Sequence, residues 1–172
     1  MIIHDECDGF QRQIHSIDNT PFRTKFEKDL IKFHGNMGIG CISDQDPQPL
    51  MFRSRMGVYA ISCIGIINNA DALVDEVCKR SGQQFAAMSS GKVNMVELLA
   101  ALINQKPTLV EGIRYAQDKI DGSATILIMT EDRLIAARDR LGRLPVLIGK
   151  HIHDGYCVSF ESFAGMKLGY EY

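Results

Sequence analysis

The sequence has 172 residues, of which 45% are hydrophobic and 23% are charged, values typical of one soluble globular domain. The net charge is −2 and no basic cluster is present, which argues against a nucleic-acid partner. Apolar runs fall short of the roughly 20 residues that a membrane span needs, and residues 1–6 lack the features of a secretion signal. We therefore expect a cytoplasmic protein that contacts no membrane.

Five cysteines are scattered along the chain without a CxxC pair, so the sequence predicts neither a zinc site nor a disulfide framework. They are Cys7, Cys41, Cys63, Cys78 and Cys157. Four of them stand beside apolar residues in expected strands or helices, and we interpret them as buried, reduced thiols. We expect no cofactor.

Residues 1–36 are more polar and less periodic than the rest, and we expect them to pack as a segment on a core of residues 37–172. Within this segment, an apolar stripe that includes Phe26 and Leu30 predicts a short helix over 24–33. No repeat or flexible linker divides the chain, so both parts belong to one domain.

The signals become sharper in the core. Residues 37–42 and 58–67 are short apolar runs rich in β-branched residues, and they predict strands. A helix follows from Asn69. Two more helices begin after Asn94 and Thr108, because each of these residues precedes a glutamate by three positions and can cap a helix.

The last third of the sequence predicts strands again. Four apolar runs separated by turn residues cover 124–130, 133–138, 145–149 and 156–160. Strands, then helices, then strands indicate an α+β fold in which helices cover sheets. His151 and His153 have a spacing that could bind a metal ion, but we interpret them as the tip of a hairpin and expect no metal site.

Several segments, in one order and spacing, resemble the amidophosphoribosyltransferases. Residues 38–40 (Gly-Ile-Gly) and 48–54 (beginning Gln-Pro-Leu) resemble the G-I-G-H-x-R-Y-S/T strand and the Q-P-L/F segment of that family. Residues 60–69 stand where the family has A-L-A-H-N-G-N-L-V-N, and residues 135–145 are close to I-A-A-R-D-P-x-G-x-R-P. Weaker matches lie at 97–103, 121–124 and 156–162.

The chain is therefore similar to the class II glutamine amidotransferase domain of that family. The resemblance implies the Ntn-hydrolase fold, an αββα sandwich of two mostly antiparallel sheets between helical layers. Counting back from Gly38 places the first strand of that fold before Met1. An incomplete sheet predicts a homo-oligomer, or a partner protein or domain that covers it. The phosphoribosyltransferase domain, which in such proteins uses ammonia to make phosphoribosylamine for purine synthesis, is expected outside these residues.

The resemblance implies a cysteine nucleophile at the mature N-terminus, with its own α-amine as the base. Cys7 follows Asp5-Glu6, which is similar to the processing site of members that remove a propeptide. About thirty residues separate Cys7 from Gly38, too few for the strand pair and the H-R-G-Q-E-like segment that the family has there. Cys7 remains an alternative nucleophile, and we otherwise expect no catalytic residue.

The positions that resemble the family's glutamine pocket have changed. Cys41 opens a stretch without a cation, where an Arg should bind the glutamine carboxylate. Cys63 and Ile64 stand at the His and Asn of H-N-G-N, so a side-chain oxyanion donor is lost while the Gly65 amide remains. Met95 replaces the Asp that receives the glutamine ammonium.

Three functions follow from these observations. The first is a glutaminase-like domain without glutaminase activity, the second an active glutaminase whose Cys7 is exposed by cleavage, and the third an interaction or regulatory module on the same fold. A register shift by one or two residues, which would bring Asn68 or Asn69 to the donor position, remains open. Asp139, Gly142 and Pro145 keep the family's turn, and we interpret them as fold residues.

Overall fold

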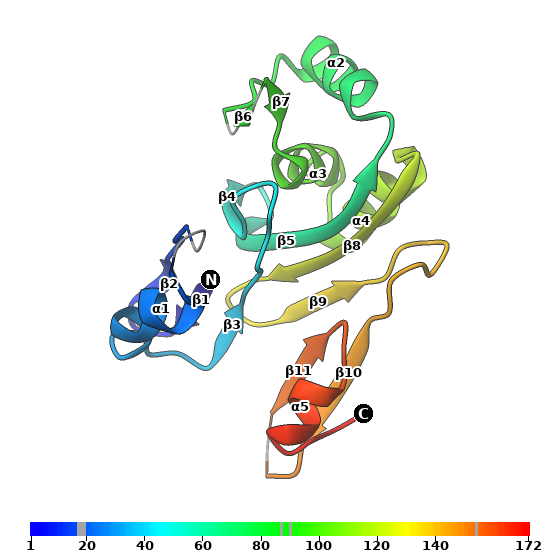
Figure 1. Cartoon of the computed structure of the whole chain (residues 1–172). Coiled ribbons are helices and arrows are strands. Elements are labelled where there is room, and N and C mark those ends of the chain that lie inside the picture. Colours follow the sequence, from blue (N-terminus) through cyan, green and yellow to red (C-terminus); the bar gives the residue numbers. More distant parts are fainter. Residues whose placement is uncertain (17–19, 87, 90, 154) are drawn as a thin grey trace.

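The computed structural model describes residues 1–16, 20–86, 88–89, 91–153 and 155–172. In these residues a central antiparallel sheet is accompanied by a three-stranded sheet from the N-terminal part and another from the C-terminal part of the chain (Figure 1). None of the helices in these ranges is long and apolar enough to cross a membrane.

The central sheet has the strand order β4-β5-β8-β9, with every neighbouring pair antiparallel. Its strands are β4 (Leu50–Ser54), β5 (Gly57–Ile67), β8 (Gly122–Met129) and β9 (Leu134–Ala137). The sequence analysis predicted β5, β8 and β9 to within two residues at each end, but it did not predict β4. The side chains alternate between the two faces of this sheet, because successive residues of a strand point in opposite directions.

Three helices cover one face of the central sheet (Figure 1). They are α2 (Ala70–Ser81), α3 (Met95–Ile103) and α4 (Leu109–Lys119), with the hairpin of β6 (Met88–Ser89) and β7 (Lys92–Val93) between α2 and α3. The predicted caps of α3 and α4 are confirmed: the Asn94 side chain accepts hydrogen bonds from two backbone N–H groups, and that of Thr108 accepts one. These bonds satisfy amides that a helix start leaves without partners.

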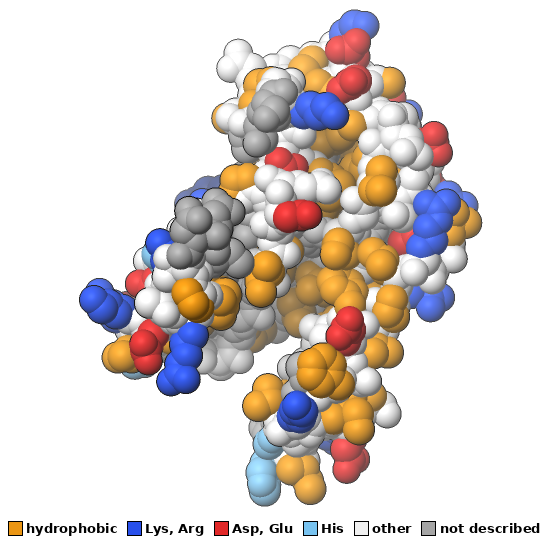
Figure 2. All heavy atoms as spheres, viewed as in Figure 1, with side chains coloured by type: hydrophobic (Ala, Val, Ile, Leu, Met, Phe, Trp, Pro, Cys, Tyr) orange, Lys and Arg blue, Asp and Glu red, His pale blue; other side chains and the backbone are white. Residues whose placement is uncertain are grey.

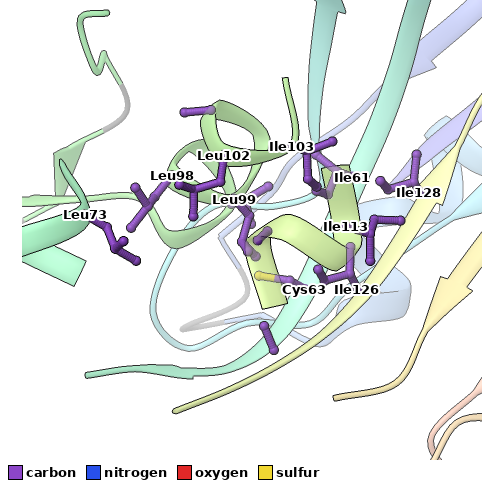
Figure 3. Close-up of a cluster of buried hydrophobic side chains, with 14 of the residues drawn as sticks. Ile61, Cys63, Leu73, Leu98, Leu99, Leu102, Ile103, Ile113, Ile126 and Ile128 are labelled. Atoms are coloured by element: carbon purple, nitrogen blue, oxygen red, sulfur yellow. The ribbon is translucent and has the colours of Figure 1, made fainter. Parts of the chain in front are cut away.

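The main core lies between these helices and the sheet. Figure 3 shows its side chains from α3 and α4 meeting those from β5 and β8, with the Cys63 thiol among them. Every residue of α3 from Val96 to Ile103 is buried. Each fully buried large apolar side chain contributes about 1.5–3 kcal/mol, so this layer supplies much of the stability of the fold.

The N-terminal sheet packs on the opposite face of the central sheet. Its strand order is β2-β1-β3, formed by β1 (Ile2–Asp5), β2 (Gly9–Arg12) and β3 (Met37–Ile39). Ile2 and Ile39 are buried against Ala60 and Met129 of the central sheet. The sequence analysis did not predict β1 and β2, so residues 1–36 contribute strands rather than only an irregular segment.

Helix α1 (Phe22–Leu30) lies beside the N-terminal sheet (Figure 1). It begins and ends two to three residues before the predicted range. Phe26 is buried, whereas Leu30 is half-exposed, so the predicted apolar stripe is only partly covered.

The C-terminal sheet projects away from the rest of the molecule (Figure 1). Its strand order is β11-β10-β12, and the helix α5 precedes β12. The elements are β10 (Leu147–His151), β11 (Tyr156–Ser159), α5 (Phe163–Lys167) and β12 (Tyr170–Glu171). The whole arrangement confirms the predicted α+β class with antiparallel sheets.

Candidate functional site

A small cleft lies at the edge of the central sheet where β5 extends beyond β4. Leu50, the first residue of β4, pairs with Ile61, so the rest of β5 has no β4 partner. The buried Gln48 side chain lies there instead: its Oε1 accepts hydrogen bonds from the Ser62 hydroxyl (3.0 Å) and the Cys63 N–H (2.9 Å). Buried backbone groups require hydrogen-bond partners. The Gln48 side chain thus supplies the acceptor that β4 would otherwise provide at this edge of the sheet.

Three parts of the chain line this cleft, which has a volume of about 90 Å³. Its walls are the loop 41–48, the β5 residues 63–65, and the first two residues of α3. All five positions that the sequence analysis assigned to an altered glutamine pocket line this one cleft: Cys41, Cys63, Ile64, Gly65 and Met95. They come from segments far apart in sequence.

Gly65 directs its backbone N–H into the cleft. The Cys63 N–H points away from β8 towards Gln48, and backbone groups two residues apart in a strand point to the same side. Gly65 also has a φ of 152°, and a Cβ atom built on it would lie 2.0 Å from the Ser123 carbonyl oxygen. Only glycine fits here, so the amide donor expected at Gly65 is held at the cleft.

The loop 41–48 is attached to the start of α3 by two hydrogen bonds. The Met95 N–H donates to Asp46 Oδ2 (3.2 Å), and Asn94 Nδ2 donates to the Pro47 carbonyl (3.2 Å). A carboxylate is stabilised at a helix N-terminus by the free N–H groups and by the helix dipole. The sequence analysis missed Asp46, because nothing near it in sequence indicates that it meets a helix 49 residues away.

The thiol that lines the cleft from β5 is unsuited to attack. Burial raises the pKa of Cys63 far above its ordinary value, and the neighbouring Cys41 and Asp46 raise it further. A thiol is nucleophilic as its thiolate, so Cys63 stays neutral at physiological pH. It behaves as a small apolar residue of the core, which confirms the interpretation of this cysteine as a buried thiol.

Cys7 lies elsewhere, in the exposed turn between β1 and β2. Its N–H donates to Asp5 Oδ1 (2.8 Å), as does the Asp8 N–H (3.0 Å). Only Cys63 of the five cysteines is buried, whereas Cys41 and Cys157 are half-buried and Cys7 and Cys78 are exposed, so the prediction of four buried thiols was largely wrong. Cleavage before Cys7 would remove β1, which is the middle strand of the N-terminal sheet and carries the fully buried Ile2.

The turn between β9 and β10 is organised by Asp139. Its carboxylate accepts hydrogen bonds from the N–H groups of Leu141 (3.2 Å) and Arg143 (2.9 Å). These bonds, that from Arg143 above all, lower the pKa of Asp139. Gly142 has a φ of 64° and donates to the Asp139 carbonyl (2.9 Å). Pro145 follows in the exposed connection to β10.

The two histidines of the last third lie at the end of β10, with ring centroids 5.5 Å apart. Their neighbour Asp154 lies outside the described residues. Within the part of the chain that the structure describes, no group of three His, Cys, Asp or Glu side chains is placed to hold a metal ion.

Comparison with known proteins supports one family. A family model described as a glutamine amidotransferase domain matches residues 34–164. The amidophosphoribosyltransferase of Methanocaldococcus jannaschii is 29% identical over 171 residues, which are 94% of this chain and 36% of that protein. The amidophosphoribosyltransferase of Bacillus subtilis is 33% identical over 131 residues, 74% of this chain and 26% of that protein. The chain thus spans about a quarter to a third of the length of these relatives.

Solved structures agree with the sequence comparison. The glutamine phosphoribosylpyrophosphate amidotransferase of B. subtilis, solved with ADP and GMP, matches with a TM-score of 0.62 and 32% identity. The match covers 81% of this chain and 29% of that one. A structure described as the allosteric regulatory enzyme of purine biosynthesis matches equally well, with a TM-score of 0.62 over 74% of this chain and 27% of that one.

Proposed function

We propose that this chain, which belongs to the class II glutamine amidotransferase domain family, keeps the fold of that family but does not itself hydrolyse glutamine. The observation that carries the proposal is the cleft at the end of β5, in which four altered positions of the expected glutamine pocket meet the retained Gly65. The cleft retains one amide donor, at Gly65, among groups that do not suit the rest of the reaction.

The chemistry of attack is not supported by the thiols of the cleft. An N-terminal nucleophile needs a thiol and an α-amine on the same residue, and Cys41 and Cys63 both lie inside the chain. The pKa of Cys63 is raised by burial, and no histidine lines the cleft among the described residues. Ile64 offers no side-chain donor for an oxyanion, and losing one such donor costs on the order of 100- to 1,000-fold in rate.

Glutamine binding is equally unsupported. Among the described residues that line the cleft, the charged ones are Asp44 and Asp46. A glutamine carboxylate would therefore meet two negative charges and no cation there. An unpaired charge out of water is strongly unfavourable. The volume of about 90 Å³ is also small beside the roughly 300–1,000 Å³ of ordinary ligand sites.

The finer fold assignment belongs to the same proposal. We assign the central sheet with α2, α3 and α4 to one half of an αββα sandwich. The N-terminal and C-terminal sheets would then belong to the second sheet layer, which is divided in this chain. We also propose that this domain has a role in purine synthesis, beside the amidophosphoribosyltransferases. The chain spans only a minor part of those enzymes.

The test is glutamine hydrolysis by the purified chain, with the intact mass recorded on the same sample and an active amidophosphoribosyltransferase as positive control. We expect no ammonia above the blank, an unprocessed mass, and no shift of the melting temperature with glutamine, since a ligand of the native state would raise it. Ammonia release together with loss of residues 1–6 would instead support the alternative of an active glutaminase using Cys7.

A non-catalytic interaction module on the same fold is the second candidate. It is favoured by a specific observation: large apolar side chains are exposed on two sheet faces, including Ile66 (67% exposed) and Ile148 (60% exposed). If neither ammonia nor glutamine binding is found, such contacts are where a function should be sought.

A further inference from the structure

Strand β5 has an unpaired edge beyond the end of β4. Leu50, the first residue of β4, lies opposite Ile61, whereas β8 pairs with the other side of β5 as far as Ile67. Figure 1 shows β5 running on past β4, and among the described residues β4 and β8 are its only neighbours in the sheet. Residues 59–63 of β5 are buried, but 64–67 are exposed or half-exposed. The edge formed by residues 64–67 is therefore open to solvent.

The backbone of this open edge points outward. Cys63 directs its N–H away from β8 to the Gln48 side chain, and backbone groups two residues apart in a strand point to the same side. The N–H and C=O groups of Gly65 and Ile67 therefore face outward as well. Within the described part of the chain, Gln48 alone bonds to β5 beyond β4, and it reaches only the backbone of Cys63.

The edge also lacks the features that protect exposed strands from pairing. Such edges commonly carry charged residues or proline, or are covered by a helix or loop. Residues 64–67 are Ile-Gly-Ile-Ile, and Ile64 and Ile66 are 40% and 67% exposed. Figure 2 shows hydrophobic side chains at the surface in this part of the molecule. An uncharged, apolar strand edge with outward backbone groups is suited to pairing with another extended chain.

We propose that this edge binds an extended peptide segment of a partner protein, which adds a strand antiparallel to β5 and in line with β4. The inference rests on the second candidate function, a non-catalytic interaction module. It concerns the central sheet, and not the strand that the resemblance implies before Met1. The peptide residue opposite Gly65 accepts the Gly65 N–H and donates its own N–H to the Gly65 carbonyl, because opposite residues of this kind exchange both hydrogen bonds.

The two faces of the sheet determine which side chains the peptide needs. Residues opposite each other carry their side chains on the same face, so the peptide residues opposite Ile64 and Ile66 lie beside apolar side chains, where β-branched residues pack well. The residue opposite Gly65 points towards the cleft of about 90 Å³, which suits a small side chain such as that of alanine. Asp44 and Asp46 line this cleft, so a basic peptide is favoured over an acidic one.

The test is an NMR titration of the isotope-labelled full chain with the peptide acetyl-Lys-Val-Ala-Val-amide, whose alanine is designed to lie opposite Gly65. We expect the amide resonances of Gly65 and Ile67 to shift saturably at millimolar peptide, and their hydrogen exchange to slow. The matched control peptide carries an N-methyl group on alanine, which removes the N–H that the Gly65 carbonyl accepts. Its Kd should be higher on the order of 10-fold or more. Equal binding of the two peptides would overturn the proposed strand pairing.

Two variants of the chain test the position of the contact. Ile66→Lys replaces an apolar contact by a charge beside a basic peptide, and Met88→Lys on β6, where Met88 is 58% exposed, is the matched control. We expect the control to bind the peptide like the wild type, and Ile66→Lys to bind it on the order of 10-fold more weakly. Circular dichroism checks that both variants are folded.

Three results would overturn the proposal. They are no saturable shift at Gly65 and Ile67, equal binding by Ile66→Lys and Met88→Lys, and shifts of the same amides with protein concentration alone, which would place a second copy on the edge. Glutamine hydrolysis is measured separately from peptide binding. A chain that binds no peptide and releases no ammonia would refute this inference while leaving the proposed loss of glutaminase activity intact.

Discussion

Replacing Gln48 by Met tests the hydrogen bonds that complete the edge of β5. Met has nearly the length of Gln but no oxygen, so the Cys63 N–H and the Ser62 hydroxyl lose their acceptor. A buried donor without a partner costs about 1–3 kcal/mol. The hydroxyl can rotate towards another acceptor, whereas the backbone N–H cannot, so we expect a total loss of about 3 kcal/mol.

For a domain of this size, about 1 kcal/mol lowers the melting temperature by roughly 2–4 °C. Gln48→Met should therefore melt about 6–12 °C below the wild type, measured by circular dichroism. Gln45→Met, in the exposed part of the same loop, is the control and should change it little. Adding Ser62→Ala to Gln48→Met should cost less than the sum of the two single changes, because the residues are hydrogen-bonded to each other.

A melting temperature of Gln48→Met within the error of that of Gln45→Met would refute this role of Gln48. The Cys63 N–H would then have another partner, and Gln48 would not hold the edge of the cleft. Full additivity of Gln48→Met and Ser62→Ala would likewise show that the 3.0 Å contact between them contributes nothing to stability.

Three further predictions concern single sites. Gly65→Ala should lower the free energy of unfolding by about 3 kcal/mol or more in a denaturant titration. The reason is that the added Cβ would lie 2.0 Å from the Ser123 carbonyl oxygen. An unchanged free energy of unfolding would contradict this close approach. In the folded protein at pH 8, a thiol reagent should modify the exposed Cys7 but not Cys63, since burial raises the pKa of Cys63 and the thiolate is the reactive form. Equal modification rates of the two thiols would contradict the burial of Cys63. The lowered pKa of Asp139 gives stability that is present above the unfolded pKa and is lost as pH falls through the folded pKa. The stability advantage of the wild type over Asp139→Asn should therefore shrink below about pH 4, and an advantage independent of pH would refute the role of the carboxylate.

Local signals allowed much of the fold to be predicted. Asn94 and Thr108 mark the starts of α3 and α4 because the capping bonds are made within three residues of the cap. The long strands β5 and β8 are apolar enough to be recognised from their own residues, without knowledge of their neighbours in the fold. In each case the energy that decides the structure comes from residues near in sequence, so a pattern of a few residues is informative.

The N-terminal strands depended on distant contacts. Strand β2 contains Gly9, Gln11 and Arg12 and has no apolar run. It forms because it pairs with β1, which is itself held by β3 on its other side. In β1 only Ile2 and His4 are buried, too short an alternation to distinguish a strand from a loop. Pairing between residues 2–4 and 37–39 overrides the weak local preference.

The charge of the cleft shows why its chemistry could be predicted only in part. The resemblance placed the loss of an Asp at Met95, and the structure shows that a carboxylate is present there after all, from Asp46 of the facing loop. This carboxylate accepts the Met95 N–H at the start of α3, so part of its charge is already compensated by the helix. It holds the loop against α3 in the place where the resemblance implies an ammonium group. A carboxylate in that role favours a closed cleft over ligand binding, and this could not be inferred from a sequence in which the two residues are 49 positions apart.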